Sequence, residues 1–454
     1  MSRLSALQRT ATSAVLGAMA LAVLDAGAVN VALPSLAAHF QETPADTTLV
    51  LSSYQAALLV GLLPSAHIAG RYGDRRIFTG GVALFCGAAI LCALAPSLPL
   101  LIAARVLQGL GAAAVMALGI ALLRRVLGND MLGSAIAWNA LTVALCSAVG
   151  PTIGAAILSV CPWPWLFLAG LPFGAAALLA SRALPVDQAP RTAIDTPSIA
   201  ILAAMVILFI IAAKVASSQT LLAITVAGSA LLFLIILLRR ATSQRSPMLP
   251  VDLLRRRPLA VQVGASICCF VGQSIGFVAL PFHLQAASHD LLTTGLVISC
   301  WPVGVACTSI VSGPIGRRLD PAAQCTAGGV VMGTGLLLLA NLPSSGSPFP
   351  LAAGTVACGV GFGLFQLANN RTLFLAAPPE RAAAAGGLQG TARLLGQTTG
   401  TLVMSLIFAL GSSAVAPRAG LAIAAVFALA SALIMNTGDR WAKVTFSADL
   451  AEDK

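Results

Sequence analysis

The chain has 454 residues, of which 58% are hydrophobic and only 9% carry a charge, and its mean hydropathy is +0.93. Soluble domains carry about 25% charged residues, so the composition excludes a soluble globular protein and indicates a chain that crosses the membrane many times. The net charge of +11 reflects membrane topology and not nucleic-acid binding, because the basic residues gather in loops on one side.

Fourteen segments are long and apolar enough to span a bilayer, which takes about 20 residues of helix. The predicted fold class is therefore an all-α integral membrane protein. The first segment is long enough to act as an anchor and not as a cleavable signal. The predicted limits are 12–34, 49–69, 77–96, 99–123, 132–158, 164–182, 198–215, 219–238, 259–281, 292–315, 322–341, 349–370, 383–411 and 417–436.

The basic residues orient these helices. With the N-terminus inside, 22 of the 26 Lys and Arg residues lie inside, Lys214 and Arg418 lie outside, and Arg105 and Arg393 lie in the membrane. Loops rich in Lys and Arg stay in the cytoplasm. We therefore expect a multi-pass protein of the bacterial inner membrane with both termini cytoplasmic.

Asp25 is the only acidic residue within the predicted membrane segments. A charge at that depth costs roughly 2.5–3.5 kcal/mol on insertion scales, so we expect Asp25 to serve a function. Asn30 follows on the same helix and is a candidate cavity residue.

The next polar side chains come from segments 49–69 and 99–123. Tyr54 and Gln55 are candidates for a substrate cavity. Arg105 and Gln108 are three residues apart and share a helix face. A buried guanidinium needs acceptors, and the candidates are Asp25, Gln108 and nearby carbonyls. The pair of Asp25 and Arg105 either couples transport to protons or merely joins two helices.

Segment 132–158 carries Trp138 and Asn139. These residues are candidates for lining an apolar site in which they also offer hydrogen-bonding groups. Gly150, Pro151 and Gly154 interrupt the same segment. The proline kinks the helix and frees a carbonyl, while the glycines allow a neighbouring helix to approach closely.

In the second half, polar side chains recur at helical spacing. Helix faces of this kind point at protein or water and not at lipid, so they either line a cavity or join helices by hydrogen bonds. The candidates are Gln366, Asn369 and Asn370 on one segment, Gln389, Arg393 and Gln397 on the next, and Trp301 on segment 292–315.

Enzymatic motifs are lacking from the sequence. It has no Walker A, HExxH, GxSxG or dinucleotide-binding pattern, and its ten cysteines show no CxxC spacing. We therefore expect no enzyme activity, no cofactor and no metal site.

Taken together, the motifs resemble those of the fourteen-spanner drug:proton antiporters of the major facilitator superfamily, over nearly the whole chain. The segments that carry the resemblance are Leu24-Asp25, Val29-Asn30-Val31-Ala32-Leu33-Pro34, Arg105-Val106-Leu107-Gln108-Gly109-Leu110-Gly111-Ala112-Ala113, Gly150-Pro151-Thr152-Ile153-Gly154, Leu280-Pro281-Phe282-His283-Leu284-Gln285, Gly361-Phe362-Gly363, Asn369-Asn370 and Arg393-Leu394-Leu395-Gly396-Gln397.

The resemblance implies two six-helix bundles related by a pseudo-twofold axis, with the substrate site between them near mid-membrane. The expected domains are an N-terminal bundle (1–197), an inserted helix pair (198–238), a basic cytoplasmic linker (239–258), and a C-terminal bundle with a short cytoplasmic tail (259–454).

Gating residues are also implied by the resemblance. Gly150, Pro151 and Gly154 form a hinge that favours export. The loop after the second helix contributes Gly70, Arg71, Gly73, Asp74 and Arg75. The family usually has an acidic residue at the position of Gly70. This loop therefore either holds the cytoplasmic gate closed less firmly or uses Asp74 in place of that acidic residue. In the second half the corresponding residues are Gly316 and Asp320, and the acid is kept.

The favoured function is therefore proton-coupled efflux of amphiphilic, mainly cationic, drugs or toxic compounds, in which Asp25 and Arg105 handle the proton. The alternative is proton-coupled transport of an anionic or neutral metabolite held by Arg105 and Arg393. The expected partners are a small-molecule substrate, protons and the lipid bilayer, and we expect a monomer.

Overall fold

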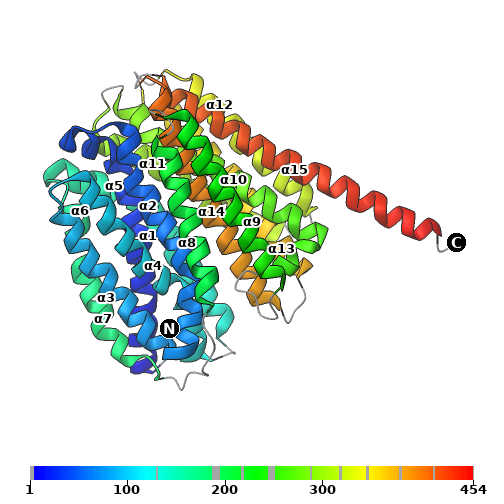
Figure 1. Ribbon diagram of the computed structural model, residues 1–454, viewed down its shortest axis with the longest axis horizontal. Helices are drawn as coiled ribbons and strands as arrows, with labels where there is room; N and C mark the ends of the chain where they lie inside the picture. Colours follow the sequence, from blue (N-terminus) through cyan, green and yellow to red (C-terminus); the bar gives the residue numbers. More distant parts are fainter. Residues whose placement is uncertain are drawn as a thin grey trace. The chain divides into compact units, whose positions relative to one another are not determined.

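A computed structural model describes residues 5–128, 131–186, 195–215, 219–243, 251–286, 289–315, 320–343, 347–377, 381–412 and 415–452. Every regular element in these ranges is a helix (Figure 1). The elements are α1 (Ala6–Phe40), α2 (Pro44–Tyr72), α3 (Asp74–Ala93), α4 (Leu98–Leu127), α5 (Leu132–Val160), α6 (Trp165–Leu168), α7 (Leu171–Ala180), η1 (Ser181–Ala183), α8 (Thr196–Val215), α9 (Thr220–Ser243), η2 (Val251–Arg255), α10 (Arg257–Gln285), α11 (Leu291–Ile315), α12 (Pro321–Asn341), α13 (Phe349–Ala376), α14 (Ala382–Leu410) and α15 (Ala416–Glu452).

Twelve helical stretches among the described residues are long and apolar enough to cross a membrane. One of them, Trp165–Ala183, combines α6, α7 and η1. The prediction of an all-helical membrane protein is thereby confirmed. The two other predicted segments coincide with α8 and α9, whose described apolar stretches are shorter, at Thr196–Ala212 and Gly228–Leu237.

The chain divides into two compact units. The N-terminal unit comprises Met1–Leu237 together with His289–Ser299, and the C-terminal unit comprises Leu238–Ser288 together with Cys300–Lys454. The first therefore holds α1 to α8, α9 as far as Leu237 and α11 as far as Ser299. The second holds the rest of α9 and α11 together with η2, α10 and α12 to α15.

Glycines set the helix spacing in the N-terminal unit, where α1 packs on α5 and α4 packs on both α2 and α3. A Cβ atom added to Gly154 of α5 would lie 2.6 Å from the Cα atom of Ala28 on α1. A side chain at Gly109 of α4 would collide with the Tyr54 carbonyl of α2. These small residues bring helix backbones together where lipid offers no hydrophobic driving force.

The C-terminal unit is built in the same way. α10 packs on α14 and α15, and α12 packs on α13 and α15. A Cβ atom at Gly328 of α12 would lie 2.5 Å from the backbone nitrogen of Phe365 on α13. This packing holds the polar side chains of α10, α13 and α14 at fixed positions inside the unit.

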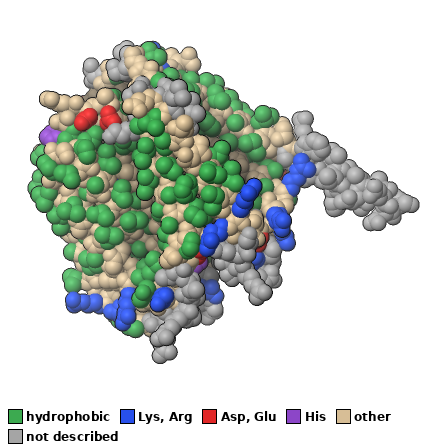
Figure 2. All heavy atoms as spheres, viewed as in Figure 1, with side chains coloured by type: hydrophobic (Ala, Val, Ile, Leu, Met, Phe, Trp, Pro, Cys, Tyr) green, Lys and Arg blue, Asp and Glu red, His purple; other side chains and the backbone are tan. Residues whose placement is uncertain are grey.

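The surface of the N-terminal unit divides by polarity. Figure 2 shows hydrophobic side chains over its middle and Lys and Arg side chains at its lower end. Arg71 closes α2, Arg75 and Arg76 open α3, and Arg124 and Arg125 close α4. The apolar band suits contact with lipid, and the basic residues at the other end are those that the sequence prediction assigned to the cytoplasm.

Candidate functional site

The predicted pair of Asp25 and Arg105 exists, deep inside the N-terminal unit. The Arg105 Nη1 atom lies 2.5 Å from Asp25 Oδ2, and the exposed fractions of the two side chains are 0% and 6%. Among the described residues, Asp25 is the only carboxylate more than one turn from the end of a candidate span. Its charge is therefore balanced inside the membrane by α4.

Gln108 closes this pair into a ring. Arg105 Nη1 also donates to Gln108 Oε1 at 2.6 Å, and Gln108 Nε2 donates to Asp25 Oδ1 at 3.0 Å. Both carboxylate oxygens thus accept a hydrogen bond from α4. The three residues Asp25, Arg105 and Gln108 are called the acid–guanidinium cluster below.

Helix α2 supplies further support for Arg105. The Arg105 Nε atom donates to the Val50 carbonyl at 3.3 Å, and the guanidinium carbon lies 4.2 Å from the centre of the Tyr54 ring. A cation over an aromatic face is attracted by the ring's quadrupole. The Tyr54 hydroxyl donates in turn to the Ala22 carbonyl of α1 at 3.3 Å, which fixes the ring between the two helices.

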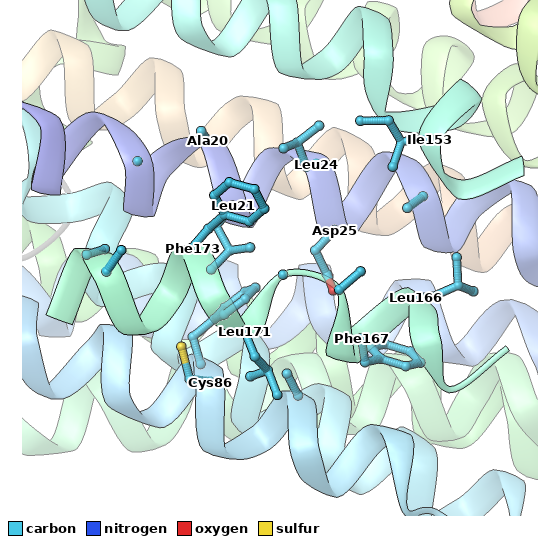
Figure 3. A pocket seen from close by; sticks show the side chains of 18 of the residues that line it. Ala20, Leu21, Leu24, Asp25, Cys86, Ile153, Leu166, Phe167, Leu171 and Phe173 are labelled. Atoms are coloured by element: carbon cyan, nitrogen blue, oxygen red, sulfur yellow. The ribbon is translucent and has the colours of Figure 1, made fainter. Parts of the chain in front are cut away.

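Asp25 also lines a cavity of about 610 Å³ inside the N-terminal unit (Figure 3). Its walls come from α1, α3, α5, α6 and α7, and from the Ala169–Gly170 break between α6 and α7. Figure 3 shows the Asp25 carboxylate directed toward Phe167 and Leu166 across this space. We call it the Asp25 crevice. None of the other residues predicted to line a substrate cavity belongs to it.

A second polar cluster lies in the C-terminal unit. Asn369 Nδ2 of α13 donates to the Ser266 hydroxyl of α10 at 2.6 Å, and that hydroxyl donates to Gln389 Oε1 of α14 at 3.2 Å. Arg393 lies one turn after Gln389, and its Nε is buried without an acceptor in the described structure. No acid–base pair in the described ranges includes Arg393. Arg105 differs in being paired with Asp25 through Nη1, although its Nη2 is also buried without an acceptor in the described structure.

The remaining cavity candidates belong to neither cluster. Trp138 packs at the edge of the apolar core around α1, α3 and α4, and the Trp301 ring packs on Phe277 with centroids 5.9 Å apart. Asn30 is fully buried on α1. The others lie on α2, α5, α13 and α14: Gln55, Asn139, Gln366, Asn370 and Gln397.

At the basic end, Asp74, the residue expected as a possible substitute for the missing acid at Gly70, forms an ion pair. Its Oδ2 lies 3.0 Å from Arg125 Nη2 at the end of α4. The Arg75 Nη1 atom donates to the Leu184 carbonyl after η1 at 3.0 Å. Gly73 joins α2 to α3 with a φ of 95°, a backbone conformation that favours glycine.

The other gating candidates are placed as follows. Gly70 and Arg71 lie in the last turn of α2, and the Arg71 guanidinium stacks at 5.7 Å on the Tyr72 ring. Gly150, Pro151 and Gly154 lie within an α5 that continues without a break. Asp320 caps α12 through the Ala322 amide at 3.4 Å. Gly316 lies outside the described residues.

Sequence reasoning missed Ser266 and the crevice walls on α3, α6 and α7. Ser266 lies four residues after Gln262 and so on the same face of α10, which is a signal that the sequence does contain. The crevice walls are ordinary apolar residues and carry no such signal. Nowhere in the described ranges do three or more His, Cys, Asp or Glu side chains gather to hold a metal ion.

Comparison with known proteins places this site in a family. The Major Facilitator Superfamily model matches residues 15–401 and, in a second overlapping match, residues 262–440. The chain is 36% identical over 396 residues to the uncharacterized transporter YebQ of Escherichia coli, which covers 86% of each protein.

Two further relatives carry more specific names. The chain is 25% identical over 393 residues to the riboflavin transporter RibZ of Clostridioides difficile, covering 86% of each protein. It is 29% identical over 403 residues to the multidrug resistance protein Stp of Mycobacterium tuberculosis, covering 86% of this chain and 74% of Stp. A crystal structure of a POT family transporter in complex with 5-aminolevulinic acid shares the fold, with a TM-score of 0.71 at 15% identity over 94% of this chain and 95% of that one.

Proposed function

The chain belongs to the major facilitator superfamily of transporters, and we propose that it exports amphiphilic, mainly cationic, compounds in exchange for protons. The observation that carries this proposal is the acid–guanidinium cluster. Asp25 is the one carboxylate well inside a candidate span in the described part of the chain, and a permanent cation holds it. Such a carboxylate can lose its charge by protonation while the cation keeps its other partners.

Arg105 retains support when Asp25 is protonated. Gln108 Oε1, the Val50 carbonyl and the Tyr54 ring all contact the guanidinium, and none of them titrates near neutral pH. Breaking a buried ion pair normally costs about 3–5 kcal/mol because it leaves an unpaired charge. These three partners reduce that cost, so a proton and a cationic substrate can alternate at Asp25.

The direction and location rest on the relatives and on the charge distribution. Stp is named a multidrug resistance protein, which supports export. The basic end of the N-terminal unit supports cytoplasmic termini in the bacterial inner membrane. In this proposal the transporter has fourteen membrane helices, acts as a monomer, and includes α8 and α9 as the inserted pair. The hinge consists of Gly150, Pro151 and Gly154. Asp74 replaces the acid that is missing at Gly70.

The test is efflux of a monovalent quaternary ammonium from proteoliposomes under a pH gradient. Asp25→Asn keeps the shape of the side chain and one oxygen that can accept from Arg105, so the variant should insert normally. It should still bind the probe weakly but lose efflux driven by the pH gradient. Wild-type efflux in this variant would remove Asp25 from the coupling mechanism.

A second candidate function is proton-coupled transport of an anionic or neutral metabolite. Two observations favour it: Arg393 Nε lacks an acceptor in the described structure, and RibZ is named a riboflavin transporter. Under this function Arg393→Ala should weaken uptake or efflux of an organic acid, and quaternary ammonium efflux should be absent from the wild type. Quaternary ammonium efflux that survives Arg393→Ala would favour the first proposal.

A further inference from the structure

The Asp25 crevice is long. Its residues on α1 run from Ser13 to Ala28, which is about 22 Å of helix at 1.5 Å per residue. Its volume of about 610 Å³ lies within the range of about 300–1,000 Å³ that is usual for small-molecule sites. The space therefore suits an extended alkyl chain or a flat ring.

The walls are apolar apart from Ser13 and Asp25. Small residues such as Gly17, Ala20 and Ala177 make much of the lining. Arg105 is absent from the lining, and its guanidinium lies 5.8 Å from the centre of the Phe167 ring, which is part of the wall. Asp25 is therefore the acidic group that the crevice offers to a ligand, and its oxygens keep acceptor capacity beyond the two bonds to α4.

The interrupted helix made of α6 and α7 forms one wall of the crevice. Pro172 lies in the first turn of α7, and Phe167, Ala169, Gly170 and Leu171 around the break all line the crevice. Ala169 and Gly170 keep right-handed helical φ and ψ values, so the wall continues through the break. The rim carries Ile153 and Phe173, whose side chains are 40% and 71% exposed, so the opening is apolar.

We propose that this crevice binds the apolar tail of the transported amphiphile, with the cationic head group at Asp25. The inference rests on the proposed function and adds a binding site to it. The tail points toward Ser13, because Asp25 lies 12 residues from that end, about 18 Å, and only three residues, about 4.5 Å, from the Ala28 end. The site thus consists entirely of residues of the N-terminal unit.

Photolabelling tests the location without requiring transport. The probe is dodecyltrimethylammonium with a diazirine at the end of its tail, added to the full-length protein in lipid nanodiscs. Adducts should map to α1 between Ser13 and Leu21 and to the facing part of α7, and excess unlabelled dodecyltrimethylammonium should suppress them. Adducts confined to other helices, or labelling that the competitor leaves unchanged, as a resident lipid chain would give, would overturn the proposal.

Filling the crevice tests the part played by the tail. A Cβ atom at Gly17 meets nothing within 4 Å, and Gly17 lies two turns from Asp25, so Gly17→Leu extends into the crevice without touching the cluster. Binding of dodecyltrimethylammonium should weaken about tenfold or more, since each displaced methylene costs about fourfold in affinity. Gly17→Ala should have a smaller effect, and binding of tailless tetramethylammonium should be unchanged.

Gly87→Leu is the matched control. Gly87 also has open space around it and lies beside Cys86 on α3, but it is not part of the crevice wall. It should bind both probes as the wild type does, with both variants melting at the wild-type temperature. Equal weakening of both probes in Gly17→Leu, or no weakening of either, would overturn the crevice assignment. Because these readouts measure binding, a wild type that labels correctly but fails to exchange protons would count against the proposed function alone.

Discussion

Arg105 donates hydrogen bonds to Asp25, Gln108 and the Val50 carbonyl, and stacks on Tyr54. These partners come from α1, α2 and α4, so a single guanidinium ties three helices together. Its planar fork and delocalised charge suit this arrangement, whereas a lysine ammonium would present a compact point charge on a flexible stem. The residue is therefore both a structural tie and the electrostatic partner of the one mid-membrane acid among the described residues.

Arg105→Ala should shift the pH optimum of transport upward. A neighbouring cation stabilises an ionised carboxylate, so its loss favours the protonated form, and a higher pH is then needed to release the proton. The measurement is the pH profile of quaternary ammonium efflux from proteoliposomes. Arg105→Lys is the control and should keep the wild-type optimum with reduced activity. An Arg105→Ala profile that is lower but unshifted would make Arg105 a purely structural residue.

At this scale the sequence indicated Asp25 and Gln108 among the candidate acceptors for Arg105, and it gave no indication of the crevice. Arg105 and Gln108 are one turn apart, and a buried cation must find acceptors, so their meeting with Asp25 follows from local spacing and electrostatics. The bond from Asn369 to Ser266 depends on the register between α13 and α10, which a single sequence does not reveal. The crevice forms where small residues leave space unfilled. Glycine and alanine also occur where two helices pack closely, so their presence in the sequence does not distinguish a cavity wall from a tight helix contact.

Among the elements, α5 shows how small residues determine helix contacts. Gly154 lies against the backbone of Ala28, whereas Gly133 on the same helix has nothing within 4 Å of its would-be Cβ atom. The sequence motif around Pro151 predicted a kink and a close contact, and the structure contains the contact with α1.

Gly154→Val should therefore destabilise the protein, by about 1–3 kcal/mol for an overpacked contact, while Gly133→Val should have little effect. The measurement is the melting temperature of both variants in the same detergent, together with Asp25-dependent efflux. If the two valines lower the melting temperature equally, the cause is valine's poor fit to a helix and not the contact with α1.

The connection between α2 and α3 places Asp74 against Arg125 of α4 at the basic end. If this pair acts as the cytoplasmic latch, Asp74→Asn and Arg125→Gln should change the efflux rate by similar factors, and the double variant should be no worse than either alone. The factors should stay within about fivefold, because Arg125 is partly exposed and such pairs couple weakly. Arg76→Gln removes a nearby charge as a control, and additive effects of Asp74 and Arg125 would rule out the latch.

Element limits were harder to predict than element existence. The first predicted segment covered 12–34, whereas α1 runs from Ala6 to Phe40, because its helix continues beyond the apolar run and begins at a capping box on Ser5. The predicted segment 164–182 is divided at Ala169–Gly170 into α6 and α7. Hydropathy measures the apolar length of a segment and is blind to a break within it.

For the whole molecule, composition and hydropathy predicted the membrane class, and ordered motifs predicted the superfamily. Whether α8 and α9 both cross the membrane is a finer question, because their described apolar stretches are 17 and 10 residues in extent, Thr196–Ala212 and Gly228–Leu237. Hydropathy over 198–238 and the positive-inside pattern predict that they do, and this remains part of the proposed function.

The number of titrating groups limits the energetics of the whole transport cycle. Asp25 is the one mid-membrane acid among the described residues, so we expect one proton per cycle. Exchange of one proton for one monovalent cation moves no net charge, and the membrane potential then contributes nothing. The pH gradient alone drives the exchange, at about 1.4 kcal/mol per pH unit, which corresponds to a tenfold concentration ratio.

A divalent cation must leave against an inside-negative potential, which costs roughly 2.3 kcal/mol per 100 mV for the extra charge. We therefore predict efficient export of monovalent cations and poor export of divalent ones of similar size. The measurement is efflux from proteoliposomes in which the pH gradient and the potential are imposed separately, with the Asp25→Asn variant as the uncoupled control. Efflux of a monovalent cation driven by potential alone would require a second titrating site, and Asp74 or a histidine would be the first to test by substitution.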